Sequence, residues 1–209
     1  PASIGPGEFF PVVGVGPHEK PWPEGAQYDP ELLLNGDRRN VLDHYRYWTV
    51  EAIVADLDSK RHKLQIAIEN WQHDLNIGSI VRTANAFNVS GVHIVGKRDW
   101  NKRGAMVTDR YLTVHHHPTV EDFAVWCKEN ELPIIGIDNV PGSKQLESAQ
   151  LPEKCVLLFG QEGAGMSDEG IAVCEVLYEI NQYGSTRSMN ASAAGAIAMY
   201  HWALQHLPR

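Results

Sequence analysis

The stretch Leu157–Ser167, LLFGQEGAGMS, joins an apolar run to a glycine-rich turn. It differs by one residue from a Walker A loop, Gly-x-x-x-x-Gly-Lys-Ser/Thr, because Met166 stands in the lysine position. Without that lysine the loop lacks the charge that reaches the outer phosphates of a nucleotide. Glu162, inside the loop, would repel a triphosphate. The loop therefore disfavours an NTPase, and a tight strand-to-helix turn with glycines at positive φ is the structural interpretation that competes with any ligand site.

Short apolar segments alternate with helical patterns along most of the chain. Runs rich in Ile, Val and Leu predict strands at 64–69, 92–96, 133–138, 155–160 and 176–180. Helical patterns lie near 38–57, 76–88, 119–130, 166–174 and 190–207. This alternation predicts an α/β fold, in which helices cover both faces of a mostly parallel sheet.

The first thirty residues differ in composition, since they hold seven of the twelve prolines and five glycines. Proline removes a backbone donor and fixes φ, so we expect neither a regular helix nor a central strand in this segment. The sequence therefore predicts an extended N-terminal arm over residues 1–36. A single domain over residues 37–209 follows, and it begins with the helix expected at 38–57.

The composition restricts the class of protein. Hydrophobic residues make up 43% of the chain and charged residues 21%, and no apolar run is long enough to span a bilayer, so we expect no membrane protein. The first residues show neither a secretory signal nor an Arg-rich transit peptide. The cysteines are odd in number and form no CxxC pair, which favours reduced core thiols in a cytoplasmic protein over a disulfide framework or a zinc site: Cys127, Cys155 and Cys174.

One segment is locally basic although the net charge of -8 argues mildly against bulk attraction to nucleic acid. Between residues 97 and 110 the chain carries five basic side chains, Lys97, Arg98, Lys102, Arg103 and Arg110. The segment is either a solvated loop or a local phosphate-binding patch. The run His115–His117 does not predict a metal site, because adjacent residues of an extended segment point to opposite sides.

Polar loops follow three of the predicted strands, at the carboxyl ends where open α/β sheets bind ligands. They read NIGSIVRTA (76–84), GQEGAGM (160–166) and SMNASAA (188–194). Arg82 of the first loop either binds a phosphate or carboxylate or forms a surface ion pair. Asn190 of the third loop is a favoured helix N-cap, and the small residues after it suit a close-packed core or a subunit interface.

Together the three loops resemble the three sequence motifs of the SpoU (TrmH-like) RNA 2'-O-ribose methyltransferases of the SPOUT superfamily. The resemblance covers about residues 65–207, and Met189 takes the place of the more usual leucine. It implies a deep trefoil knot in the C-terminal part of the sheet domain and a homodimer. It also implies S-adenosylmethionine as cofactor and transfer RNA or ribosomal RNA as substrate.

The resemblance also implies roles for particular residues. Methyl transfer to a ribose 2'-hydroxyl would involve Arg82, Asn76, Glu162, Ser188 and Asn190. Cofactor contacts, largely through backbone groups, would come from Gly160, Ile180, Met189, Leu158 and Gln182. The family proposes the arginine as general base, but a guanidinium hardly deprotonates in proteins. Arg82 therefore has a second possible role, in which it binds a phosphate and stabilises charge on the 2'-oxygen.

Two other functions stay open beside the methyltransferase. A non-catalytic RNA-binding or ribosome-assembly factor on the same fold predicts RNA affinity without methyl incorporation. A nucleotide-binding protein requires ATP binding through residues 160–167. If the methyltransferase is correct, the basic segment 97–110 is expected to bind RNA phosphates, but it carries no code for a particular base.

Overall fold

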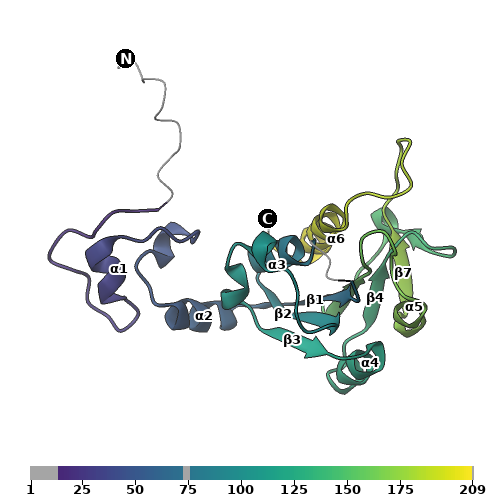
Figure 1. Cartoon of the computed structure of the whole chain (residues 1–209), viewed down its shortest axis with the longest axis horizontal. Coiled ribbons are helices and arrows are strands. Elements are labelled where there is room, and N and C mark those ends of the chain that lie inside the picture. Colours follow the sequence, from purple (N-terminus) through teal and green to yellow (C-terminus); the bar gives the residue numbers. More distant parts are fainter. Residues whose placement is uncertain (1–13, 73–75, 209) are drawn as a thin grey trace, which may run out of the picture. The chain divides into compact units, whose positions relative to one another are not determined.

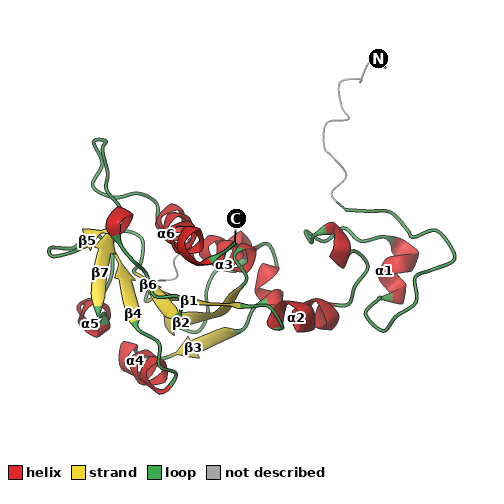
Figure 2. Ribbon diagram, turned by 180° about the vertical axis from the view of Figure 1, so that it is seen from behind, coloured by secondary structure: helices red, strands yellow, loops and turns green. Residues whose placement is uncertain are grey.

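The computed structural model describes residues 14–72 and 76–208 (Figures 1 and 2). The chain divides into two compact units, the first ending at Ser59 and the second beginning at Lys60. The boundary predicted after residue 36 rests on composition and stays a prediction. The two units are described separately below.

The N-terminal unit contains short helical elements, which are α1 (Pro30–Asn35), the 3-10 turn η1 (Asp43–Tyr45) and α2 (Val50–Asp58). The extended arm predicted over residues 1–36 is wrong at α1, and its residues 1–13 lie outside the described part of the chain. Pro30 stands in the first turn of α1, where proline needs no N–H donor and its fixed φ is favourable. The Asp29 carboxylate caps this turn by accepting hydrogen bonds from the next backbone N–H groups.

The helix predicted over 38–57 forms only in its second half. Tyr47 adopts a left-handed φ of 64°, which no α-helix contains, so the helical pattern before it does not become helix. The helix α2 starts after Thr49, whose side chain accepts a hydrogen bond from the N–H of Ala52. Apolar spacing alone therefore placed the start of this helix about a dozen residues too early.

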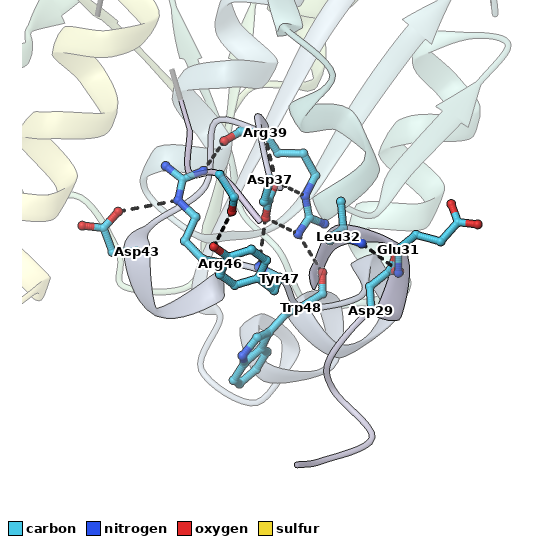
Figure 3. A network of polar contacts seen from close by, with 10 residues as sticks. Asp29, Glu31, Leu32, Asp37, Arg39, Asp43, Arg46, Tyr47 and Trp48 are labelled. Atoms are coloured by element: carbon cyan, nitrogen blue, oxygen red, sulfur yellow. Dashed lines mark hydrogen bonds and ion pairs between the residues drawn. The ribbon is translucent and has the colours of Figure 1, made fainter. Parts of the chain in front are cut away.

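The N-terminal unit contains a buried ion pair within a network of polar contacts (Figure 3). The Asp37 side chain is fully buried, and Arg39 donates to both of its oxygens, at 2.8 Å to Oδ1 and 2.7 Å to Oδ2. The same guanidinium donates to the carbonyl of Trp48, and the N–H of Tyr47 donates to Asp37. Burial raises the pKa of Asp37, but the hydrogen bonds and charge of Arg39 outweigh it and hold that pKa at about 2.

The second unit is built on a seven-stranded sheet in the order β3-β2-β1-β6-β4-β7-β5. Every pair of neighbouring strands is parallel, so the predicted parallel sheet is confirmed. Two edge strands, β3 and β5, were not among the five predicted. The strands are β1 (His62–Asn70), β2 (Val89–Gly96), β3 (Val114–His117), β4 (Ile134–Ile137), β5 (Lys144–Gln145), β6 (Cys155–Phe159) and β7 (Val176–Glu179).

Helices cover both faces of this sheet, as predicted (Figures 1 and 2). On one face α3 (Asn76–Ala86) and α6 (Ala191–His206) pack on side chains such as Ile66. On the other face α4 (Val120–Glu129) and α5 (Asp168–Val173) pack on side chains such as Ala67. The side chains of adjacent residues in a strand thus pack into opposite apolar layers. Three 3-10 turns complete the unit, η2 (Arg103–Ala105), η3 (Thr108–Tyr111) and η4 (Leu146–Ser148).

The strand order decides where the predicted loops meet. The strands β1, β6, β4 and β7 are consecutive and parallel, so their carboxyl ends lie at one edge of the sheet. The segments after these four strands, including the second and third loops, therefore leave the sheet side by side. None of the helices within 14–72 and 76–208 combines the length and apolar character that crossing a bilayer requires.

Candidate active site

A cavity of about 400 Å³ opens at this edge of the sheet. Its walls come from the ends of β4 and β6, from the glycine-rich loop after β6, and from the segment between β7 and α6. The lining residues are Ile137, Asp138, Asn139, Val140, Phe159, Gly160, Gln161, Glu162, Gly163, Ala164, Gly165, Met166, Ile180, Gln182, Ser188, Met189, Asn190, Ala191 and Ala194. The second and third sequence motifs thus form one site.

The loop Gly160–Ser167 is closed on itself by backbone pairing. The N–H of Gln161 donates to the carbonyl of Gly165 at 3.1 Å, and the reverse bond is 2.9 Å long. Gly163 and Gly165 have φ of 86° and 72°, which confirms the expected turn with positive φ. A Cβ on Gly160 would collide with the backbone of Gly165 and Met166, so only glycine allows this close approach.

Met166, which replaces the Walker lysine, is buried. It is 6% exposed and packs in the apolar layer beneath α4 and α5, with its sulfur 3.9 Å from the Sγ of Cys174. A lysine there would bury a charge among apolar side chains. Packing therefore favours an apolar residue at this position, whether or not the ligand has a phosphate that a lysine could bind.

Two carboxylates that were not predicted as site residues hold the end of the loop. Asp138, directly after β4, accepts a hydrogen bond from the N–H of Met166 at 2.7 Å. Glu69, fully buried in β1, accepts from the N–H of Ser167 at 2.8 Å and from its hydroxyl. The same hydroxyl caps α5 by accepting from the N–H of Gly170. Asp138 is the last residue of the predicted strand 133–138. This position at the carboxyl end of a strand could have marked it as a candidate site residue.

Side chains of all three motifs meet in one hydrogen-bond network. The Asn76 amide donates to Glu162 Oε2. The Asn190 amide donates to Asn76 Oδ1 at 2.8 Å and to Glu162 Oε1 at 3.3 Å. Asn190 also caps α6, because its Oδ1 accepts the N–H groups of Ser192 and Ala193. The predicted N-cap role of Asn190 is confirmed, and it coexists with a place in the site.

The predicted cofactor residues occupy two kinds of position. Gly160, Ile180, Gln182 and Met189 line the cavity, whereas Leu158 is fully buried within β6 and lies outside the lining. Of the residues predicted for methyl transfer, Glu162, Ser188 and Asn190 line the cavity. Asn76 is not among the lining residues, but it forms hydrogen bonds with two of them, Glu162 and Asn190.

Arg82 lies on the exposed side of α3 and is not among the lining residues. Its neighbours Ile80, Val81 and Ala84 are instead buried in the apolar core. Within the described residues, Arg82 therefore does not complete the cavity of its own chain.

The cavity is anionic. Its lining contains two carboxylates, Asp138 and Glu162, and none of the lining residues is Lys, Arg or His. Walls of this kind favour a ligand with positive charge and disfavour a polyphosphate. The nucleotide-binding alternative therefore lacks a cationic partner for its ligand at residues 160–167.

The basic segment is fixed beside the first motif. A Cβ on Gly78 or Gly104 would come within about 3 Å of the facing backbone, which shows how tightly α3 packs against η2. The Asn70 amide, at the end of β1, donates to the carbonyls of Lys97 and Asp99. All five predicted RNA-binding side chains are exposed, and only one pairs with a carboxylate in the described part of the chain, since Lys102 lies 3.0 Å from Asp109.

The histidine run and the cysteines show no catalytic arrangement. His117 faces His93, with 2.9 Å between their ring nitrogens, whereas His116 bonds the carbonyl of Gly96, so the predicted alternation is confirmed. Within residues 14–72 and 76–208 no three His, Cys, Asp or Glu side chains gather as metal ligands. Burial raises the pKa of each cysteine thiol to about 12, which leaves all three poor nucleophiles: Cys127, Cys155 and Cys174.

The fold and site define an α/β protein with an anionic cavity at the carboxyl edge of its parallel sheet and a basic surface segment beside the first motif. The sequence profile of the SpoU rRNA Methylase family matches residues 63–200, and the chain belongs to this family.

Similar proteins carry tRNA methyltransferase names. The tRNA (guanosine(18)-2'-O)-methyltransferase of Borreliella burgdorferi is 25% identical over 147 residues, which are 69% of this chain and 67% of that protein. The protein of the same name from Escherichia coli K12 is 25% identical over 69% of this chain and 64% of its own length. In Saccharomyces cerevisiae the corresponding match covers 74% of this chain but only 12% of the relative.

Solved structures show the same fold. The SpoU methyltransferase AviRb from Streptomyces viridochromogenes superposes with a TM-score of 0.64 at 24% identity, covering 73% of this chain and 63% of that one. The TrmH/SpoU tRNA modifying enzyme of A. aeolicus gives a TM-score of 0.65 at 21% identity, covering 75% and 81%.

Proposed function

We propose that the protein is an S-adenosylmethionine-dependent RNA methyltransferase that acts on a ribose 2'-hydroxyl. The observation that carries this proposal is the hydrogen-bond network of Asn76, Glu162 and Asn190, which joins the three family motifs at the wall of an anionic cavity. Relatives named as tRNA 2'-O-methyltransferases support it. The chain spans from 67% to 12% of the relatives described above, so the activity of the whole protein is a proposal.

The cavity suits S-adenosylmethionine. Its volume of about 400 Å³ lies in the range of small-ligand sites, its glycine loop brings backbone groups close, and its carboxylates match the positive charges of this cofactor. Gly160, Ile180, Gln182 and Met189 would hold it from the lining. Bound there, the cofactor supplies an electrophilic methyl group on a positively charged sulfur.

The remaining chemistry belongs to the protein's side chains. The ribose 2'-oxygen must be held in line with the methyl group, and its proton must pass to solvent water as the oxygen–carbon bond forms and the carbon–sulfur bond breaks. Asn76, Glu162 and Asn190 fix one another by hydrogen bonds, so they present a rigid polar wall to the ribose, with the exposed Ser188 hydroxyl beside it. Arg82 binds a neighbouring phosphate and stabilises negative charge on the 2'-oxygen, because a guanidinium does not act readily as a base.

We also propose that the protein acts as a homodimer through α6. This helix exposes an apolar stripe at helical spacing, in which Ile197, Tyr200 and Leu204 are 42%, 57% and 45% exposed. Arg82 does not line the cavity of its own chain, as expected of a residue that completes the site of a partner. The C-terminal trefoil knot of the family and a cytoplasmic location, which free thiols favour, belong to the same proposal.

The RNA substrate, transfer or ribosomal, would lie along the basic segment. Lys97, Arg98, Arg103 and Arg110 are exposed and form no ion pair with a described residue, so they are available to phosphates; Lys102 would have to leave Asp109. The segment packs against α3, which carries Arg82. Charge and position together support this segment as the RNA-facing surface.

A methyl-transfer assay with labelled S-adenosylmethionine and total RNA tests the function. We expect label on ribose 2'-oxygens, and Arg82→Ala should lower the rate about 100- to 1000-fold while the melting temperature stays unchanged. Lys128→Ala on α4 removes the same charge from a surface away from the motifs and should keep full activity. RNA binding without any methyl incorporation by the wild type would instead support the non-catalytic factor.

Mixing two inactive variants tests the dimer. If Arg82 acts in the partner's site, a chain with Arg82→Ala and a chain with Glu162→Ala together form dimers that hold one intact site. After unfolding and refolding of an equal mixture we expect about a quarter of wild-type activity, as twofold symmetry dictates. A mixture as inactive as its components would show that Arg82 serves its own chain.

A further inference from the structure

Asp138 differs from Glu162, the other carboxylate of the cavity, because backbone N–H groups rather than side-chain amides donate to it in the described chain. Its Oδ2 accepts the N–H of Met166 at 2.7 Å and its Oδ1 accepts the N–H of Asn139 at 2.8 Å. No Lys, Arg or His of the described chain forms an ion pair with it. Glu162, in contrast, accepts hydrogen bonds from Asn76 and Asn190. The wall beside β4 thus carries a negative charge that no side chain compensates.

The position of this charge is fixed. Two backbone donors on different segments hold the Asp138 carboxylate, so it does not turn toward solvent freely. Gly165 leaves the space for it, because a Cβ there would lie 2.9 Å from Oδ2. A preorganised charge in a protein cavity acts on the charge of a ligand over several ångströms, without needing direct contact.

We propose that Asp138 sets the selectivity of the cavity for the methyl donor over the demethylated product. The inference rests on the proposed function, since it takes S-adenosylmethionine as the ligand. Donor and product share the adenosine and amino acid groups, and they differ by one methyl group and by the positive charge on sulfur. Loss of that charge on transfer removes the attraction to Asp138, so the neutral product S-adenosylhomocysteine is bound less tightly and leaves.

Calorimetric titration of both ligands into the wild type and Asp138→Asn tests the inference. We expect the substitution to weaken binding of the donor about tenfold more than binding of the product, a difference in binding free energy of about 1.4 kcal/mol. Sinefungin carries an ammonium group near the position of the sulfonium, so its binding should weaken by about as much as binding of the donor. Equal losses for all three ligands would overturn the inference, because the carboxylate would then hold the loop or contact a group that the ligands share.

Two further variants complete the test. Asp168→Asn removes the same charge at an exposed position just outside the cavity lining and should leave the ratio of the two affinities unchanged. Asp138→Ser is a second neutral variant whose hydroxyl still accepts a hydrogen bond, for use if Asp138→Asn does not fold. Loss of the fold in both neutral variants would also overturn the inference, since the charge would then be structural. A wild type that binds neither donor nor product would contradict the proposed function instead.

Discussion

The two compact units of the chain are stabilised in different ways. The sheet unit has two apolar layers, and its central strands are almost completely buried. From residue 14 to its end, the N-terminal unit buries few apolar side chains, and it contains the buried Asp37–Arg39 ion pair. Charge separates them too, because residues 1–59 hold ten acidic and four basic side chains and so carry most of the net charge of -8. Under the proposed function, this difference favours the sheet unit as the RNA-binding part, since the acidic N-terminal unit would repel phosphates.

Truncating an apolar side chain should damage the sheet unit most. Phe123 of α4 is fully buried in one apolar layer, so Phe123→Ala leaves a cavity and should cost about 3–5 kcal/mol of unfolding free energy. Denaturant unfolding followed by circular dichroism measures this loss. Exposed Val125 on the same helix gives the control, because Val125→Ala removes little buried surface. A cost below about 1 kcal/mol for Phe123→Ala would contradict the layered core.

Removing a charge should instead damage the N-terminal unit. Asp37→Asn breaks the ion pair with Arg39 and should cost about 2–3 kcal/mol, which corresponds to the lowering of the Asp37 pKa from 3.8 to about 2. Faster amide exchange in residues 28–48 would report this loss. The pKa of Asp37 falls from 3.8 to about 2 on folding, so its contribution is present above pH 3.8 and is lost as the pH falls toward 2. Unchanged exchange in this variant would mean that the apolar contacts of Leu33 and Ile53 suffice.

Acid should weaken the sheet unit at a higher pH. Burial, together with the charges of His115 and His117, lowers the pKa of His93 from 6.5 to about 2. Because the unfolded chain takes up this proton and the folded one does not, stability falls as the pH drops below about 6.5, by about 2 kcal/mol at pH 5. His93→Gln should flatten the pH dependence, and the same change at exposed His44 should not. Parallel profiles for wild type and His93→Gln would refute this role of His93.

The sheet was predictable because its central strands are buried on both faces and read as continuous apolar runs, whereas its helices bury one apolar stripe. Apolar content therefore placed the five inner strands within a few residues of their observed bounds, namely β1, β2, β4, β6 and β7. The helix expected at 38–57 failed because Tyr47 adopts a left-handed φ, which apolar spacing does not encode. The edge strand β3 was missed since its histidines do not read as an apolar run, although His93 and Trp126 bury part of them.

The site was predictable only where a family motif marked it. The motifs pointed to Asn76, Glu162 and Asn190, and the structure joins these three through hydrogen bonds. Glu69 and Asp138 stood inside strand patterns and read as the polar ends of apolar runs. Their function depends on which strands are neighbours, because β1 and β4 both flank β6 and so both reach the loop that follows it. Strand order is a property of the fold that local spacing does not contain.

Mapping ribose 2'-O-methyl groups in total RNA from cells with and without the gene tests the central claim most directly. We predict that one nucleotide of a transfer or ribosomal RNA loses its 2'-O-methyl group in the deletion. The wild-type gene should restore that group, and the Glu162→Ala variant should not. An identical methylation map in the two strains, together with no methyl transfer to the deletion strain's RNA by the purified protein, would contradict the assignment.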